Sequence, residues 1–344
     1  MRVNNLLLSI EDGCGVIITS RANIFYYSGF TSEDATLLIT KTRRILVTDS
    51  RYTYQAKVEA PTFEIRNVSE GIVAIAKELD CESLCFEENT VTVSEFALFQ
   101  KFGKKLIPSA KTIARPRYIK EGAEIEKIKK AEELASAAFD ALLSELHTGM
   151  TENEVALFLE FYMRKNGASG LSFPTIVASG VRSCMPHGEA TDKVIEAGDF
   201  VTIDFGCILD GYCSDMTRTV VMGKASERQK EIYDIVLLAQ ISAIDAIKVG
   251  KPCSEIDGVA RKIITDAGYG ENFGHSLGHS LGIEIHESPN FSSKSEDLCQ
   301  IGNVITVEPG IYIDGFGGVR IEDVVVIGET VQNLTKSCKD FTII

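Results

Sequence analysis

Two aspartates, Asp204 and Asp215, lie on either side of an Asp-Gly pair at positions 210–211. An Asp-Gly pair between two alternating segments is a strong sign of a two-residue hairpin turn. With that turn, Asp204 lies opposite Thr217, and side chains alternate along each strand with a period of two. The register therefore predicts that the two carboxylates share one face of the hairpin, about 7–8 Å apart as diagonal neighbours.

Two carboxylates at this spacing repel each other unless a cation lies between them. A site for two metal ions about 3.5–4 Å apart matches the spacing. The alternative is an ordinary hairpin whose two aspartates face solvent, and a single β-bulge would also break the register. The hairpin alone leaves these interpretations open.

Three more residues in the second half of the chain have side chains suited to divalent cations. His279 lies in the segment Gly278–Gly282, whose small residues let the backbone approach another group closely. Glu308 and Glu322 lie in segments that are otherwise apolar and strand-like, where a carboxylate is a poor core residue unless it is paired or coordinated. Each has a simpler explanation. Glu308 could end a strand at the surface, Glu322 could pair with Arg320, and His279 could form a helical surface pair with His275, four residues earlier.

Together, four carboxylates and one imidazole form a hard, oxygen-rich ligand set. This set favours Mn²⁺ and is also compatible with Co²⁺, Zn²⁺ or Fe²⁺. Two bridged cations would lower the pKa of a bridging water from about 15.7 toward 7, so a hydroxide nucleophile would form at neutral pH. One carboxylate could then act as general base, and a nearby histidine could protonate a leaving group or stabilise an oxyanion.

The elements that hold these residues belong to the second of two predicted domains, as expected for 344 residues. Residues 1–117 alternate short strands and helices and contain no histidine, which indicates a small α/β domain. Residues 118–344 alternate capped helices with strands, which predicts an α+β fold with a mixed or antiparallel sheet. The pattern predicts a long helix over 123–147 and strands that include 24–27, 283–286 and 319–324.

The net charge of the chain indicates which partners are unfavourable, and its cysteines indicate the cellular compartment. Up to residue 115 the chain has 14 basic and 14 acidic residues, so the formal net charge of −14 lies entirely in the remainder. An acidic chain argues against nucleic acid or an anionic membrane as partner. The nine cysteines show no zinc-finger spacing, and no apolar run approaches the length of a membrane span. These features predict a cytoplasmic protein with reduced thiols.

Seven segments of the second domain stand in an order that matches a known family. In chain order they are Phe173–Gly180, Pro186–Gly188, Gly198–Gly206, Gly211–Thr219, Gly278–Glu287, Glu308–Gly310 and Arg320–Asp323. The set resembles the Xaa-Pro peptidases, aminopeptidase P and prolidase, which are metallopeptidases of the pita-bread fold. The resemblance covers the second domain closely and the first domain in general layout. It implies a pita-bread catalytic domain preceded by a smaller domain of the creatinase/prolidase type.

The resemblance also implies a ligand set. Asp204 and Asp215 would bind one metal ion, with Asp215 bridging. His279 and Glu308 would bind the second ion, and Glu322 would bridge both. Glu308 would in addition be the general base.

Other residues would act on the substrate. By the same resemblance, His187 and His286 would contact the substrate and stabilise or protonate the transition state. His275 would lie at the substrate wall, and Arg320 would support the metal ligands or the end of the substrate. The family's substrates have proline in the second position, and its members commonly form homodimers.

The leading hypothesis is a dinuclear aminopeptidase that hydrolyses the Xaa-Pro bond at the N-terminus of peptides. The sequence leaves open a prolidase restricted to Xaa-Pro dipeptides. Methionine aminopeptidase shares the catalytic fold, but the extra first domain of this chain argues against that enzyme. Creatinase is a relative that uses no metal, and the complete set of ligand residues in this chain argues against it. A non-catalytic binding protein on the same scaffold is the alternative of another class, and such a protein is expected to have lost ligands.

Overall fold

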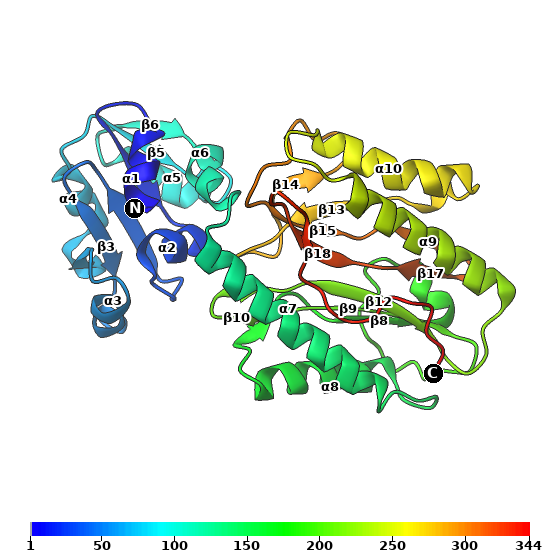
Figure 1. Cartoon of the computed structure of the whole chain (residues 1–344). Helices are drawn as coiled ribbons and strands as arrows, with labels where there is room; N and C mark the ends of the chain where they lie inside the picture. Colours follow the sequence, from blue (N-terminus) through cyan, green and yellow to red (C-terminus); the bar gives the residue numbers. More distant parts are fainter. Residues whose placement is uncertain (1) are drawn as a thin grey trace. The chain divides into compact units, whose positions relative to one another are not determined.

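The computed structural model describes residues 2–344, which divide into two compact units, one ending at Arg117 and one spanning Tyr118–Ile344 (Figure 1). Each unit has its own sheets and its own buried core. In the described residues, no helix is long and apolar enough to cross a membrane.

The first unit is built on one six-stranded mixed sheet in the order β4-β3-β2-β1-β5-β6. Its strands are β1 Cys14–Ile18, β2 Ala35–Ile39, β3 Arg44–Thr48, β4 Glu64–Asn67, β5 Ser83–Phe86 and β6 Lys105–Pro108. Its helices are α1 Arg2–Leu8, α2 Arg21–Ser28, α3 Thr53–Glu59, α4 Ile72–Lys77, α5 Val93–Gln100 and α6 Ala110–Ala114, with short 3₁₀ turns η1 Val68–Glu70 and η2 Arg115–Arg117. Parallel and antiparallel pairs both occur, which suits a sheet with crossover helices.

The predicted strand at 24–27 is wrong, because this segment lies in helix α2. Ser20 caps the helix by accepting a hydrogen bond from the backbone N–H of Asn23, and Gly29 ends it in the left-handed conformation. The buried carboxylate of Glu87 accepts hydrogen bonds from Ser20 and from the side-chain amide of Asn23, so contacts across the fold fix this end of the helix. Such contacts override the β propensity of the apolar residues.

The second unit places two pairs of helices against several small sheets. The helices are α7 Gly122–Leu143, α8 Glu152–Lys165, α9 Glu227–Ala246 and α10 Cys253–Asp266, with 3₁₀ turns η3 Gly180–Cys184 and η4 Gly270–Asn272. Three-stranded sheets join β8 Ile176–Ser179, β9 Phe200–Phe205 and β12 Met216–Val221, and β7 Gly170–Leu171, β10 Cys207–Leu209 and β11 Tyr212–Cys213. A five-stranded sheet joins β13 Gly278–Ser280, β14 Glu287–Phe291, β15 Val304–Val307, β18 Asp323–Val326 and β19 Gln332–Asn333, and β16 Gly310–Ile313 pairs with β17 Gly317–Arg320.

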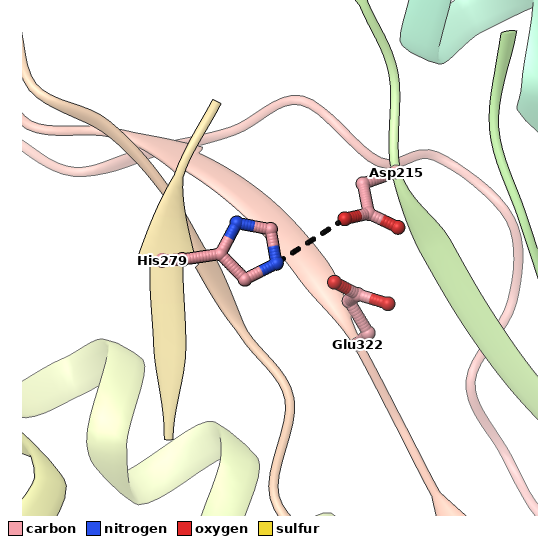
Figure 2. A group of neighbouring side chains, drawn as sticks. All are labelled: Asp215, His279 and Glu322. Carbon is pink, nitrogen blue, oxygen red and sulfur yellow. Dashed lines mark ion pairs between the residues drawn. The ribbon is translucent and has the colours of Figure 1, made fainter. Parts of the chain in front are cut away.

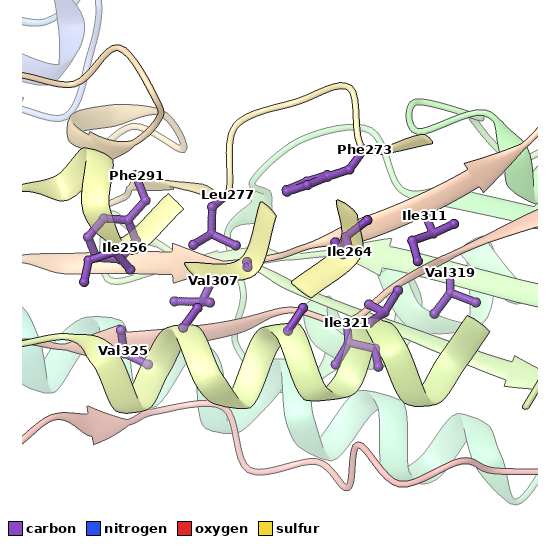
Figure 3. Close-up of a cluster of buried hydrophobic side chains, with 14 of the residues drawn as sticks. Ile256, Ile264, Phe273, Leu277, Phe291, Val307, Ile311, Val319, Ile321 and Val325 are labelled. Carbon is purple, nitrogen blue, oxygen red and sulfur yellow. The ribbon is translucent and has the colours of Figure 1, made fainter. Parts of the chain in front are cut away.

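Two apolar cores hold this unit together. In one core, residues of α9 and α10 such as Ile256 and Ile264 pack with Val307, Ile321 and neighbouring strand residues (Figure 3). The other core packs α7 and α8 against β8, β9 and β12. In Figure 1 the pair α9 and α10 and the pair α7 and α8 flank opposite sides of the strands. The strands are thereby fixed between two helical layers.

The predicted hairpin register is confirmed. Asp204 pairs with Thr217, and Leu209 pairs with Tyr212 on the last positions before the turn. The turn residues Asp210 and Gly211 both have positive φ, 51° and 80°, as a type I′ turn requires. The pairing keeps one register from β9 and β12 through β10 and β11, so no bulge separates the two aspartates.

Two further expectations about elements need correction. The helix predicted to reach residue 147 ends at Leu143, so His147 lies outside it. Residues 283–286 are not a strand, because the carboxylate of Glu287 accepts hydrogen bonds from the backbone N–H groups of Ile283 and Glu284 and so replaces a strand partner.

The strand predicted over 319–324 is interrupted. β17 ends at Arg320 with β16 as its partner, and β18 begins at Asp323 with β15 as its partner. At the change of partner, the backbone N–H of Glu322 donates to Thr217 O over 3.1 Å. Glu322 therefore lies at the junction between two sheets and beside the hairpin.

The close packing of the hairpin gives a stability prediction. A Cβ at Gly206 would lie 1.9 Å from Ser214 O, whereas a Cβ at Gly258 in α10 would have no neighbour within 4 Å. We expect Gly206→Ala to lower the free energy of unfolding by about 3 kcal/mol or more, at the upper end of overpacking effects. The control Gly258→Ala should be neutral or stabilising by about 1 kcal/mol, because alanine favours helix. Urea unfolding measures both, and wild-type stability in Gly206→Ala would contradict the prediction.

Candidate active site

The structure brings all five predicted ligand residues to one cavity of about 450 Å³ in the second unit. They come from separate elements: Asp204 lies in β9, Asp215 directly before β12, His279 in β13, Glu308 directly after β15 and Glu322 between β17 and β18. The predicted placement of Asp204 and Asp215 on one face of the hairpin agrees with this geometry, because both line the same cavity.

Asp215, His279 and Glu322 form the tightest group (Figure 2). Each offers one ligand atom, and these atoms all lie within 4.8 Å of one another. His279 Nε2 lies 3.5 Å from Asp215 Oδ2 and 3.4 Å from Glu308 Oε1. One imidazole nitrogen therefore faces two carboxylates, a suitable arrangement for a shared cation.

Arg320 contacts Asp204 rather than Glu322. Its Nη2 donates to Asp204 Oδ2 over 2.6 Å, and its Nε donates to the Thr217 hydroxyl oxygen over 3.0 Å. The Thr217 hydroxyl in turn donates to Glu322 Oε2 over 2.7 Å. The guanidinium of Arg320 thus binds Asp204 directly and is connected to Glu322 only through the hydroxyl of Thr217. An ion pair between Arg320 and Glu322, the alternative that the sequence left open, is therefore not what the structure shows.

The carboxylates of the cavity oppose one another's ionisation. Burial raises the pKa of Asp215 well above its usual value, and the charges of Glu322 and Asp204 raise it further. Burial also raises the pKa of Glu322, with Glu308 and Asp204 adding to the shift. The pKa of Glu308 is raised chiefly by burial, although His275 and Arg320 oppose that shift. A divalent cation would remove this penalty.

Two oxygen atoms support the fit of a cation. Among the described residues, Asp204 Oδ1 and Glu322 Oε1 are buried and have no hydrogen-bond partner. Buried carboxylate oxygens are ordinarily hydrogen-bonded or coordinated. His279 also suits coordination, because burial lowers its pKa and favours the neutral imidazole that a metal requires. The residues present therefore fit a divalent cation site.

Three other histidines line the same cavity, at the positions expected for substrate contacts. The rings of His286 and His279 meet edge to face, with their centroids 4.4 Å apart. His275 Nε2 lies 2.9 Å from the hydroxyl of Tyr312, and Arg320 Nη1 donates to the same hydroxyl over 2.8 Å. His187 lines the wall of the cavity and is exposed.

Sequence reasoning missed Glu132, a buried residue of α7. Its carboxylate accepts a hydrogen bond from the backbone N–H of Asp215 over 2.7 Å and one from the Thr335 hydroxyl over 3.1 Å. Burial raises the pKa of Glu132 to about 8, with the hydrogen bonds opposing the shift. The signal was an acidic residue on the apolar face of the predicted helix, between Ala131 and Ala135.

Arg218 is a second support that sequence reasoning missed. Its buried guanidinium donates to Asp323 Oδ1 over 2.8 Å and to the backbone oxygens of Thr217 and Glu322. It also donates to the backbone oxygens of Ser337 and Cys338 near the end of the chain. Arg218 therefore ties the hairpin to the strand junction that carries Glu322.

Comparisons with known proteins identify the family of the chain. Residues 126–329 match the model of metallopeptidase family M24, and residues 11–119 match the creatinase/prolidase N-terminal domain. The chain belongs to metallopeptidase family M24. Membership makes it a metal-dependent hydrolase, and the predicted fold class, a pita-bread domain after a smaller α/β domain, is confirmed.

Similar proteins cover the M24 chain almost end to end. An uncharacterised peptidase of Bacillus subtilis, YqhT, is 43% identical over 337 residues, which are 96% of each chain. The structure of an Xaa-Pro dipeptidase from Bacillus anthracis has a TM-score of 0.97 and 42% identity, covering 100% of this chain and 99% of that one. The structure of an X-Pro aminopeptidase from Thermotoga maritima has a TM-score of 0.92 and 41% identity, covering 100% of both. The resemblance stated from the motifs is confirmed.

The raised carboxylate pKa values predict how stability depends on pH. Asp215 and Glu322 have folded-state pKa values above the unfolded value of about 4, so the unfolded chain ionises first as pH rises. Their stabilising contribution is complete below about pH 4 and is lost as pH rises through the folded pKa values. A bound cation offsets this loss, so we expect Mn²⁺ to raise the melting temperature more at pH 8 than at pH 5.

Thermal unfolding of metal-free protein with and without added MnCl₂ measures this difference. Asp215→Asn should remove most of the shift, whereas Asp314→Asn, at an exposed position between β16 and β17, should retain it. An equal Mn²⁺ shift at both pH values in the unaltered chain would contradict the prediction.

Proposed function

We propose that this protein is a dinuclear peptidase that hydrolyses the Xaa-Pro bond at the N-terminus of peptides. The observation that carries the proposal is the convergence of five carboxylates and four histidines on one cavity. The relatives named as an Xaa-Pro dipeptidase and an X-Pro aminopeptidase support the proline specificity. The cavity wall also includes Phe173, Pro174 and Ile285, whose apolar surfaces suit a pyrrolidine ring.

Asp204, Asp215, His279, Glu308 and Glu322 would hold two divalent cations, with Mn²⁺ as first choice and Co²⁺, Zn²⁺ or Fe²⁺ as alternatives. When bound, the cations would supply Lewis acidity and lower the pKa of a water molecule. Asp215 and Glu322 belong, with His279, to the tightest group of ligand atoms and would help to hold the cations. The free cysteines and the acidic charge support a cytoplasmic location, and the family resemblance alone supports a homodimer.

Glu308 is the proposed general base that accepts a proton from the attacking water. Its Oε1 accepts a hydrogen bond from the Thr306 hydroxyl over 3.0 Å, which fixes the carboxylate at the cavity wall. When the Xaa-Pro bond breaks, its nitrogen must gain a proton to leave as the proline amine. His187 or His286 would donate to the carbonyl oxygen or to that nitrogen.

The remaining proposed substrate contacts come from other residues that line the same cavity. Burial lowers the pKa of His286, and the neighbouring imidazoles of His279 and His187 lower it further. His275 and Arg320 share the hydroxyl of Tyr312, which would set the shape of the cavity around the substrate. Arg320 would also keep Asp204 in place through their 2.6 Å ion pair.

A substrate panel tests the proposal. With Mn²⁺ bound, we expect cleavage of Ala-Pro and Ala-Pro-Ala, because both carry the Xaa-Pro bond, and no measurable cleavage of Met-Ala. Released amino acids are quantified chromatographically. Cleavage of Ala-Pro alone would favour a dipeptidase, cleavage of Met-Ala would contradict the proline specificity, and no cleavage by metal-loaded folded protein would favour a binding protein.

A further inference from the structure

Residues 180–190 follow β8, begin with the turn η3 and carry His187 to the wall of the catalytic cavity. We call this segment the His187 loop. Pro186 and Glu189 of the loop line the same cavity. His187 itself is exposed, so packing against its side chain does little to fix the imidazole. The position of the ring therefore depends on how the backbone of the loop is held.

Glu152, the first residue of α8, binds both ends of the His187 loop with one fully buried carboxylate. Its Oε1 accepts hydrogen bonds from the backbone N–H and from the hydroxyl of Ser179, each over 2.8 Å. Its Oε2 accepts hydrogen bonds from the backbone N–H of Thr191 over 3.1 Å and from the hydroxyl of Thr191 over 2.7 Å. Ser179 directly precedes the loop and Thr191 directly follows it, so Glu152 fastens the two ends together.

Arg182 connects this carboxylate to the part of the loop that contains His187. Its Nη1 forms an ion pair with Oε2 of Glu152, and its Nη2 donates to the backbone oxygen of Glu189 over 2.9 Å. Glu189 lies two residues after His187, and its backbone N–H donates to the backbone oxygen of His187 over 3.0 Å. Charge-assisted hydrogen bonds of this kind are about twice as strong as neutral ones. The guanidinium thus links Glu152 to the turn that presents His187.

The partners of Glu152 distinguish it from an ordinary helix cap. A carboxylate in the first turn of a helix is favourable beside the N–H groups of that turn. The five hydrogen bonds that Glu152 accepts within the described structure instead come from Ser179, Arg182 and Thr191. Each of these donors lies in the His187 loop or directly beside it.

We propose that Glu152 is a positioning residue which, through Arg182, holds the His187 loop so that His187 meets the substrate at the scissile bond. The inference rests on the proposed Xaa-Pro cleavage and on the proposed contact of His187 with the substrate. Glu152 and Arg182 both lie outside the lining of the catalytic cavity, so they act on the reaction only through the loop. Displacing a catalytic group by about 1 Å can lower a rate about 100-fold.

Kinetics of Ala-Pro cleavage by Mn²⁺-loaded protein test this inference. Arg182→Met removes the guanidinium and keeps an unbranched side chain, whereas Glu152→Gln keeps the shape of the side chain and removes its charge. We expect each variant to lower kcat about tenfold and to leave KM within about twofold, because the imidazole is displaced while the rest of the cavity is unchanged. His187→Ala should lower kcat about 100-fold, as the loss of one proton donor would.

A double-mutant cycle separates positioning from a merely structural role. In the His187→Ala background, Arg182→Met should change kcat by less than about twofold, because the position of the loop no longer matters once the imidazole is absent. Two independent losses would instead multiply to about 1000-fold, and that result would overturn the inference.

Arg164→Met is the matched control, because Arg164 is another arginine of α8 and its ion pair with Glu160 lies at the helix surface. It should leave kcat and KM unchanged. Circular dichroism shows whether each variant is folded, and Arg182→Met, at a partly exposed position, carries the test if Glu152→Gln does not fold. Wild-type kcat in folded Arg182→Met would overturn the inference and leave the proposed function standing, whereas an inactive metal-loaded wild-type chain would overturn both.

Discussion

Repulsion among buried carboxylates is the constraint on which the rest of the second unit depends. Burial is the first cause that raises the pKa of Asp215, Glu308 and Glu322. The charges of Glu322 and Asp204 raise the pKa of Asp215 further, and those of Glu308 and Asp204 raise the pKa of Glu322 further. Burying charges of one sign together is unfavourable unless opposite charge enters the same space. The single buried cation of the wall, Arg320, pairs with Asp204 and leaves the other carboxylates without an ion-pair partner of fixed charge in the described structure. Divalent cations bound among these carboxylates would supply that opposite charge.

Groups outside the cavity hold the mutually repelling carboxylates in place. Glu132 binds the backbone of Asp215 from α7, and Arg218 binds the backbone of Glu322 from β12. Thr217 connects Arg320 with Glu322 at the centre of the hairpin. These contacts fix the ligand positions before any cation binds, which lowers the cost of ordering the site. The apolar cores on either side supply the stability that offsets the strain of the charges.

The sequence predicted correctly the parts of the site that depend on neighbouring residues, such as turn type and strand register. The Asp210-Gly211 turn sets the pairing of Asp204 with Thr217, since a two-residue turn fixes the register of its strands. Glu308 and Glu322 were identified because a carboxylate in an apolar strand needs a partner. The motif order then indicated the family, and the family model agrees.

The sequence did not predict the features that depend on contacts between residues far apart in the chain. Helix α2 was mistaken for a strand because Glu87, far along the chain, anchors its first turn. The break between β17 and β18 follows from a change of pairing partner, which periodicity does not reveal. Glu132 and Thr217 support the ligands from other elements, so only the folded arrangement shows their contacts.

The most direct test of the cation site is equilibrium dialysis of metal-free protein against Mn²⁺, with circular dichroism as a check on folding. We predict about two bound ions per chain, as a carboxylate-bridged dinuclear site requires. Asp204→Asn should bind fewer ions and lose activity while it keeps the wild-type spectrum, because one ligand charge is removed from a shape that is otherwise unchanged. A folded wild-type chain that binds no Mn²⁺, Co²⁺, Zn²⁺ or Fe²⁺ would contradict the account.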